Sequence, residues 1–441
     1  MGTRQGGNGS GRRAPRELRG AGAALVLAAT LVASACGSPD AAAPPPPGAG
    51  SSGAAPASPA ADARSADPAP AGAPLPDGVA RVLPTAWQRL AVSADTLDPA
   101  AGYPRSVAAG ADRWELKPIR DWTGGFFPGQ LWSAEVLTGD PAWRARAQRW
   151  SAPLASQATR TDTHDLGFVI EDSLGTQARL TGDPQAAATV VTAARSLATR
   201  YAPRVHAIKS WDTEGDDDKR GQWRFPVIVD NLMNLPLLHH AATLPGGDRA
   251  WADIATDHAL TASRTNLRPD GSTAHVAVFD PDTGAFQKRD TWQGAAPEST
   301  WARGQGWAIH GFTAAARASG RPELRDAAVR SADWWLAHTG ADPVPPWDFS
   351  KPGEERDTSA AAVAASGLLD LADLVGGAAG ARYRDAAGAT MTTLATRDVA
   401  PTGPALLAHT VGGKPQDSEI DVGMVYTDHY FLEAARRWQG R

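Results

Sequence analysis

Apolar residues recur every three or four positions along most of the chain, from about residue 79 to near its end. This spacing is the period of helices that bury one face. When each periodic stretch is read to its stop residue, about twelve helices are expected, in consecutive pairs. They are expected at 79–98, 125–138, 141–157, 166–181, 184–201, 230–243, 248–265, 301–319, 322–339, 358–375, 380–396 and 424–439. The pattern therefore predicts an all-α fold.

A short recurring turn joins the helices of each pair. The letters LTGDP stand at 137–141 and again at 180–184, and looser forms occur near 246, 320 and 376. In LTGDP the glycine suits the left-handed position past a helix end, the aspartate can cap the next helix, and the proline fits its first turn. Six such hairpins, with longer connections at their other ends, favour a closed (α/α)6 barrel of inner and outer helices. An open solenoid is the alternative.

One connection departs from the helical pattern. Residues 272–292 read STAHVAVFDPDTGAFQKRDTW, in which side chains alternate between apolar and polar on both sides of the turn DPDTG. This alternation predicts a small β-hairpin inserted between two helices.

The N-terminal part of the chain predicts two segments without a folded core. Arginines followed by the apolar stretch at 21–36 are typical of an export signal, here 1–36. The only cysteine, Cys36, closes this stretch in the context ASAC, which resembles a bacterial lipoprotein box. We therefore expect an exported protein held by a lipid anchor on the outer face of the bacterial cell membrane; simple cleavage and secretion is the alternative. Residues 37–76 are mostly Ala, Pro, Gly and Ser and predict a disordered tether, which leaves 77–441 as the barrel domain.

The composition narrows the choice of partner. The chain has 43 Lys and Arg against 48 Asp and Glu, and it has no basic stripe of the kind that binds nucleic acid. It has 16 Trp against 5 Tyr, and tryptophan faces stack well on sugar rings. No zinc-ligand spacing, nucleophile elbow or phosphate loop is found, so we expect no metal and no cofactor.

Two aspartates stand in front of apolar runs, where a buried helix face is expected. They are Asp165 in THDLGF and Asp230 in IVDNLMN. One interpretation is capping, because aspartate is among the best N-cap residues. The other is chemistry, because two carboxylates among tryptophans suit glycosidic bonds, and a like charge and apolar neighbours would raise the pKa of Asp230. His164 and Asn231, beside these acids, add polar groups that a plain cap does not need.

Six motifs in one order carry a resemblance that covers about residues 114–439. They resemble those of glycoside hydrolase family 88, the unsaturated glucuronyl hydrolases. The motifs are DWTGGFFPGQLW (121–132), TDTHDLGF (161–168), VIVDNLMNLPLL (227–238), WARGQGWAIHGF (301–312), PPWDFSKPGEERDTSAAAVAASGLLDLA (345–372) and SEIDVGMVYTDHYFLEA (418–434).

The resemblance implies an (α/α)6 barrel that needs no metal and acts on oligosaccharides left by polysaccharide lyases. Their non-reducing end carries a 4,5-unsaturated glucuronic acid. Asp230 would protonate C4 of this enol ether and take a proton from the water that adds at C5, while Asp165 would raise the pKa of its partner and hold ring hydroxyls. The hemiketal then collapses, opens the ring and releases the aglycone. The matching substrate contacts are Trp122, His164, Trp211, His275, Gln293, Arg303 and Trp307.

Some features leave the substrate open. Arg303 is expected to bind the substrate carboxylate through its guanidinium fork, and an internal ion pair is its alternative role. Thr427 and His429 in YTDHYF replace the residues usual in the family, and LAHTVGGK (407–414) lacks an aromatic that some members carry. We expect both stretches near the aglycone. The alternative functions are an unsaturated rhamnogalacturonyl or other unsaturated-uronide hydrolase, and a sugar-binding lipoprotein without catalysis.

Overall fold

The computed structural model describes residues 72–213 and 215–441, which lie within one compact unit spanning 63–441. The predicted export signal with Cys36 lies outside the described residues, as does the predicted tether up to residue 71.

The last residues of the predicted tether, 72–76, are described and contact the end of the final helix. The backbone N–H of Gly72 donates to the carbonyl of Gln439 at 2.9 Å. Nε1 of Trp438 donates to the carbonyl of Pro74, also at 2.9 Å. Folded structure therefore begins a few residues earlier than expected.

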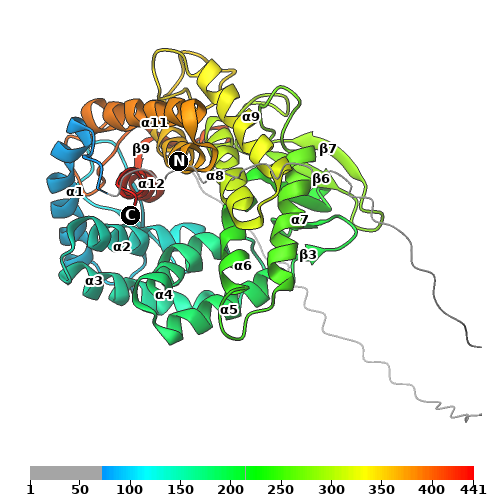
Figure 1. Cartoon of the computed structure of the whole chain (residues 1–441), viewed down its shortest axis with the longest axis horizontal. Coiled ribbons are helices and arrows are strands. Elements are labelled where there is room, and N and C mark those ends of the chain that lie inside the picture. Colours follow the sequence, from blue (N-terminus) through cyan, green and yellow to red (C-terminus); the bar gives the residue numbers. More distant parts are fainter. Residues whose placement is uncertain (1–71, 214) are drawn as a thin grey trace, which may run out of the picture. The chain divides into compact units, whose positions relative to one another are not determined.

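The helices of the described residues form two rings (Figure 1). The inner ring consists of α2 (Phe126–Thr138), the π-helix η3 (Gly167–Gly175) with α4 (Thr176–Thr181), α6 (Leu235–Ala241), α8 (Ala302–Ser319), α10 (Thr358–Val375) and α12 (Val425–Trp438). The outer ring consists of α1 (Asp77–Thr96), α3 (Ala142–Ser151), α5 (Pro184–Ala198), α7 (Ala250–Thr265), α9 (Pro322–His338) and α11 (Gly377–Arg397). Inner-ring contacts run from α2 through η3, α6, α8, α10 and α12 back to α2. The predicted (α/α)6 barrel is confirmed, because an open solenoid would lack the last contact.

Burial separates the two rings. The inner helix α10 is buried on all sides, as expected for a helix that lacks a polar face. By length and composition it could cross a membrane, but 78% of it is buried inside the described part of the chain, which is typical of a core helix. The outer helix α1 buries a single stripe, spaced by three and four, at Val79, Val82, Leu83, Ala86 and Leu90.

The two inner helices next to the candidate acids begin with irregular turns. The stretch 166–181 opens as the π-helix η3, a form that is frequent at functional sites. The stretch 230–243 opens as the 3-10 helix η5 (Val229–Asn234), and α6 begins only at Leu235. Pro236 lies in the first turn of α6, where its missing N–H leaves no helical bond unmade.

Small sheets are inserted between the helices. The predicted hairpin is confirmed by the antiparallel pair β6 (Val276–Phe279) and β7 (Phe286–Asp290). The sequence did not predict β5 (Phe225–Ile228), which pairs with β6 to give the order β5-β6-β7. It also missed a sheet of order β2-β1-β9-β8, whose strands are β1 (Tyr103–Val107), β2 (Glu115–Lys117), β8 (Thr410–Gly413) and β9 (Ser418–Met424). The short strands β3 (Tyr201–Ala202) and β4 (Ala207–Ile208) pair with each other.

Candidate active site

A pocket of about 320 Å³ is enclosed by the segments that lead into the inner helices and by the β8–β9 hairpin. We call its deepest part the floor, formed by His164, Asp165, Asp230, Arg303 and Trp307. Of these, His164, Arg303 and Trp307 are at most 1% exposed. We call its outer part the rim, formed by Arg105, Arg220, Trp292, Gln416, Ser418 and Glu419.

The pocket gathers nearly all of the side chains that the sequence singled out. Lining it are Trp122, His164, Asp165, Trp211, Asp230, Gln293, Arg303 and Trp307. His275 is the one that does not line it. Its Nδ1 accepts hydrogen bonds from the backbone N–H groups of Trp292 at 3.0 Å and Gln293 at 3.1 Å. Burial lowers the pKa of His275 to about 3, so its ring is neutral. This ring supports the backbone of Trp292 and Gln293, two residues that line the pocket.

The capping interpretation of the two aspartates is wrong. Asp165 makes no cap to η3, and its Oδ2 instead accepts a hydrogen bond from Thr163 Oγ1 at 2.7 Å. Asp230 lies within the first turn of η5, which has no side-chain cap. Its Oδ1 is buried and has no hydrogen-bond partner among the described residues. Both carboxyl groups face the pocket instead.

Electrostatics distinguish the two acids. Burial and, next, the negative charge of Asp165 raise the pKa of Asp230 well above its ordinary value. Arg303 acts in the opposite direction, but its effect is smaller. A carboxyl group in this position holds its proton to higher pH than an ordinary aspartate does, and it can deliver that proton to a substrate.

His164 adds a neutral polar group to the floor. It is fully buried, and burial lowers its pKa. Its Nε2 lies 3.2 Å from Oδ1 of Asp165. The charge of Asp165 is therefore not cancelled by an imidazolium and continues to act on Asp230.

Arg303 makes an internal ion pair, so its alternative role is observed. Nη1 donates to Asp357 at 3.2 Å, to Ser359 at 3.2 Å and to the carbonyl of Val411 at 2.6 Å, and Nη2 donates to the carbonyl of Gly412 at 2.7 Å. The fork is thus turned toward the protein. Nε has no partner among the described residues, and Nη2 uses one of its two N–H groups, so the side chain keeps donors for a substrate carboxylate together with its positive charge.

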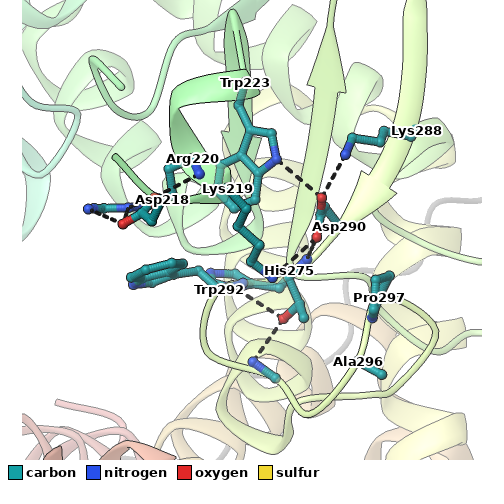
Figure 2. Close-up of polar contacts among 12 residues, drawn as sticks. Asp218, Lys219, Arg220, Trp223, His275, Lys288, Asp290, Trp292, Ala296 and Pro297 are labelled. Carbon is teal, nitrogen blue, oxygen red and sulfur yellow. Dashed lines mark hydrogen bonds and ion pairs between the residues drawn. The ribbon is translucent and has the colours of Figure 1, made fainter. Parts of the chain in front are cut away.

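The rim was missed by sequence reasoning, although Trp292 adjoins the predicted Gln293. The guanidinium of Arg220 lies 4.3 Å from the ring centre of Trp292. Figure 2 shows the support behind this pair, where Asp290 accepts from Lys219 at 3.4 Å and from Trp223 Nε1 at 3.2 Å. Apart from the tryptophans, no local signal marked these positions.

The expectation for Thr427 and His429 is wrong, because neither lines the pocket. Tyr426 does, and its ring stacks on Trp122 with ring centres 5.4 Å apart. His429 lies deeper in the barrel, with its ring 5.2 Å from that of Phe126. Thr427 follows Tyr426 directly and so points to another face of α12, whereas His429 comes three positions later and lies almost one turn further along the helix.

Comparison with family models gives no match. Curated relatives do match. An unsaturated glucuronyl hydrolase of Formosa agariphila is 38% identical over 77% of this chain and 85% of its own length. An unsaturated glucuronyl hydrolase of Bacillus sp. strain GL1 is 35% identical over 75% of this chain and 89% of its own length.

Solved structures agree with these relatives. An unsaturated glucuronyl hydrolase specific for heparin superposes with a TM-score of 0.77 at 37% identity, covering 82% of this chain and 97% of that one. A mutant unsaturated glucuronyl hydrolase from Streptococcus agalactiae, complexed with dGlcA-GalNAc6S, gives a TM-score of 0.69 at 26% identity, covering 83% of this chain and 93% of that one.

Proposed function

Because the chain belongs to the unsaturated glucuronyl hydrolases, we propose that it releases 4,5-unsaturated glucuronic acid from the non-reducing end of glycosaminoglycan-like oligosaccharides made by lyases. The observation that carries this proposal is the floor of the pocket. There, burial and the charge of Asp165 raise the pKa of Asp230, so a proton donor stands beside a second carboxyl group.

The reaction is a hydration of the enol ether, with Asp230 as acid and then as base. Its proton goes to C4, and the electron pair of the C4–C5 double bond forms the new C–H bond. Water oxygen bonds to C5, and the proton that this water loses returns to the carboxylate of Asp230. The hemiketal at C5 opens to a ketone, which leaves C1 as a hemiacetal. Collapse of this hemiacetal to an aldehyde breaks the C1–O bond to the aglycone and releases the aglycone as an alcohol.

The other floor residues prepare this step. Asp165 keeps the pKa of Asp230 raised and offers carboxylate oxygens to the ring hydroxyls. Arg303 supplies positive charge for the substrate carboxylate, and its Nε, which has no partner among the described residues, can donate to that group. Trp122, Trp211 and Trp307 give the sugar ring apolar faces.

The test uses the ultraviolet absorbance of the conjugated double bond in unsaturated disaccharides from chondroitin, hyaluronan and heparin lyase digests. We expect the wild-type protein to remove this absorbance and Asp230→Asn to leave it. The matched control is Asp172→Asn, because burial also raises the pKa of Asp172 well above its ordinary value but this residue does not line the pocket. Asp172→Asn should retain activity.

Two results would contradict the proposal. Equal loss of absorbance with Asp230→Asn would remove this residue from the chemistry. Loss with none of these disaccharides, but with an unsaturated pectin fragment, would favour the rhamnogalacturonyl alternative.

We also propose that the protein is exported and lipid-anchored through Cys36. The support is the sequence of residues 21–36, in which an apolar stretch ends in small residues and the only cysteine. Metabolic labelling with radioactive palmitate in a bacterial host should mark the full chain and not Cys36→Ser. An unlabelled wild-type chain in the culture medium would instead indicate simple cleavage and secretion.

A further inference from the structure

The oligosaccharide beyond the unsaturated residue must leave the pocket past the rim. Gln416 and Ser418 are exposed, so the β8–β9 hairpin forms an open edge of the pocket. Glu419 follows Ser418 on β9 and also lines the pocket. With the unsaturated sugar at Asp230, the neighbouring sugar meets this hairpin.

The cations around the pocket are already neutralised by protein carboxylates. Arg220 is 3.2 Å from Asp216 and 2.9 Å from Asp218. Arg303 is paired with Asp357. Lys414, which follows the pocket-lining Gly413, is 2.5 Å from Glu355. A sulfate group on the substrate would therefore compete with carboxylates already in place.

Arg105 shows this most clearly. Its Nε and Nη2 donate to the two carboxylate oxygens of Glu419 at 2.5 and 2.8 Å. Its Nη1 donates to both oxygens of Asp121 at 3.0 Å. The guanidinium thus serves two carboxylates, and the group carries a net negative charge. The side chains of Arg105 and Glu419 are only 16% and 13% exposed, so water screens this charge incompletely.

The backbone of the β8–β9 hairpin and its neighbours fix the position of the Glu419 side chain. Its φ is 54°, a left-handed conformation that residues with side chains seldom adopt unless their surroundings hold them. The double hydrogen bond with Arg105 supplies such a hold. Gly412 makes the necessary room, because a Cβ there would lie 2.6 Å from Oε2 and 2.7 Å from Cβ of Glu419.

We propose that Glu419 is a specificity-determining residue that makes this chain select substrates whose neighbouring sugar carries no sulfate. It does so in two ways: it occupies Arg105, and it places a carboxylate where the sulfate would lie. The inference rests on the proposed function, because it assumes that the unsaturated residue binds at Asp230. The Streptococcus agalactiae relative, by contrast, was solved with the sulfated dGlcA-GalNAc6S.

The experiment compares kcat/KM for unsaturated chondroitin disaccharides without sulfate, with 4-sulfate and with 6-sulfate. These substrates differ only in the sugar that meets the rim. We expect the unsulfated disaccharide to be preferred by about tenfold or more at low salt, and this ratio to shrink at about 0.5 M NaCl as charges are screened. Glu419→Gln keeps the shape and removes the charge, so it should lower the ratio several-fold.

The control is Glu323→Gln, which removes a carboxylate from a surface ion pair with Arg321 outside the pocket and should leave the ratio unchanged. Either sulfated disaccharide being cleaved as fast as the unsulfated one by the wild-type protein overturns the inference, even if Glu419→Gln does not fold. A ratio that responds neither to salt nor to Glu419→Gln also overturns it. Cleavage of none of the three overturns this inference, and the proposed function fails with it only if the hyaluronan and heparin disaccharides are also left intact.

Discussion

The floor and the rim of the pocket treat charge in opposite ways. On the floor, Oδ1 of Asp230 has no hydrogen-bond partner in the part of the chain that the structure describes, and the pKa of Asp230 is raised by burial and by Asp165. On the rim, Arg105 and Arg220 each have two carboxylate partners. A buried polar group without a partner lowers the stability of the fold, but it is available for a reaction. An ion pair near the surface contributes little to stability, and its main effect is on which substrates can bind. The comparison therefore assigns chemistry to the floor and selection to the rim.

The largest effect is expected from Asp230→Asn, which tests the floor. Loss of a general acid should lower kcat by about 10²–10⁴. The raised pKa also means that the folded protein holds a proton that the unfolded chain loses above about pH 4, so wild-type stability falls as pH rises toward the folded pKa. Asparagine carries no such penalty. The melting temperature of Asp230→Asn should therefore be at least that of wild type at pH 7, and the difference in favour of the variant should be smaller at pH 4. A large loss of melting temperature at pH 7 would indicate a structural role for Asp230.

Asp165→Asn should have the next largest effect. We expect kcat to fall by about a hundredfold, within the range for groups that support proton transfer. Without the charge of Asp165 the pKa of Asp230 decreases, so the high-pH limb of the kcat profile should move to lower pH. A limb that stays in place would contradict the coupling between these two acids.

Arg303→Lys should raise KM and lower stability together. Lysine cannot reproduce hydrogen bonds to Asp357, Val411 and Gly412 at once, and we expect a loss of about 1–3 kcal/mol in the free energy of unfolding. Urea denaturation measures this loss. The control is Arg146→Lys, because Arg146 pairs with Asp95 at the surface, and its loss should stay within about 0.5 kcal/mol.

The smallest effect is expected on the rim from Arg220→Ala. A partly exposed ion pair and a cation–π contact with Trp292 each contribute roughly 0.2–1 kcal/mol. KM should rise a few-fold, and kcat should fall much less. A fall in kcat comparable to that of Asp165→Asn would remove the distinction between rim and floor.

The sequence predicted the floor because helical periodicity and the motifs are local. The expected helix 358–375 coincides with α10, and the polar residues before the inner helices meet in the pocket. It did not predict the rim, because β1 pairs with β9 at Ser106 and Met424, which lie more than three hundred residues apart. Nor could residue type show that Asp165 binds Thr163 instead of capping a helix.

His275 shows a different limit of sequence reasoning. A histidine among pocket motifs suggests substrate contact, yet its Nδ1 is used by the backbone of Trp292 and Gln293. Whether such a side chain faces the pocket or supports its wall depends on hydrogen bonds with a loop about seventeen residues away in the chain. Only the folded arrangement fixes that choice.

The most direct test of the central claim is proton NMR of the product formed in deuterium oxide, read at early times before exchange beside the new ketone. If Asp230 protonates C4, the wild-type enzyme should place one deuterium at C4 on one face, and Asp230→Asn should form no such product. If the released uronate instead keeps its double bond and carries no deuterium at C4, the bond at C1 is cleaved directly. That result would contradict the assignment of Asp230 as the acid for hydration.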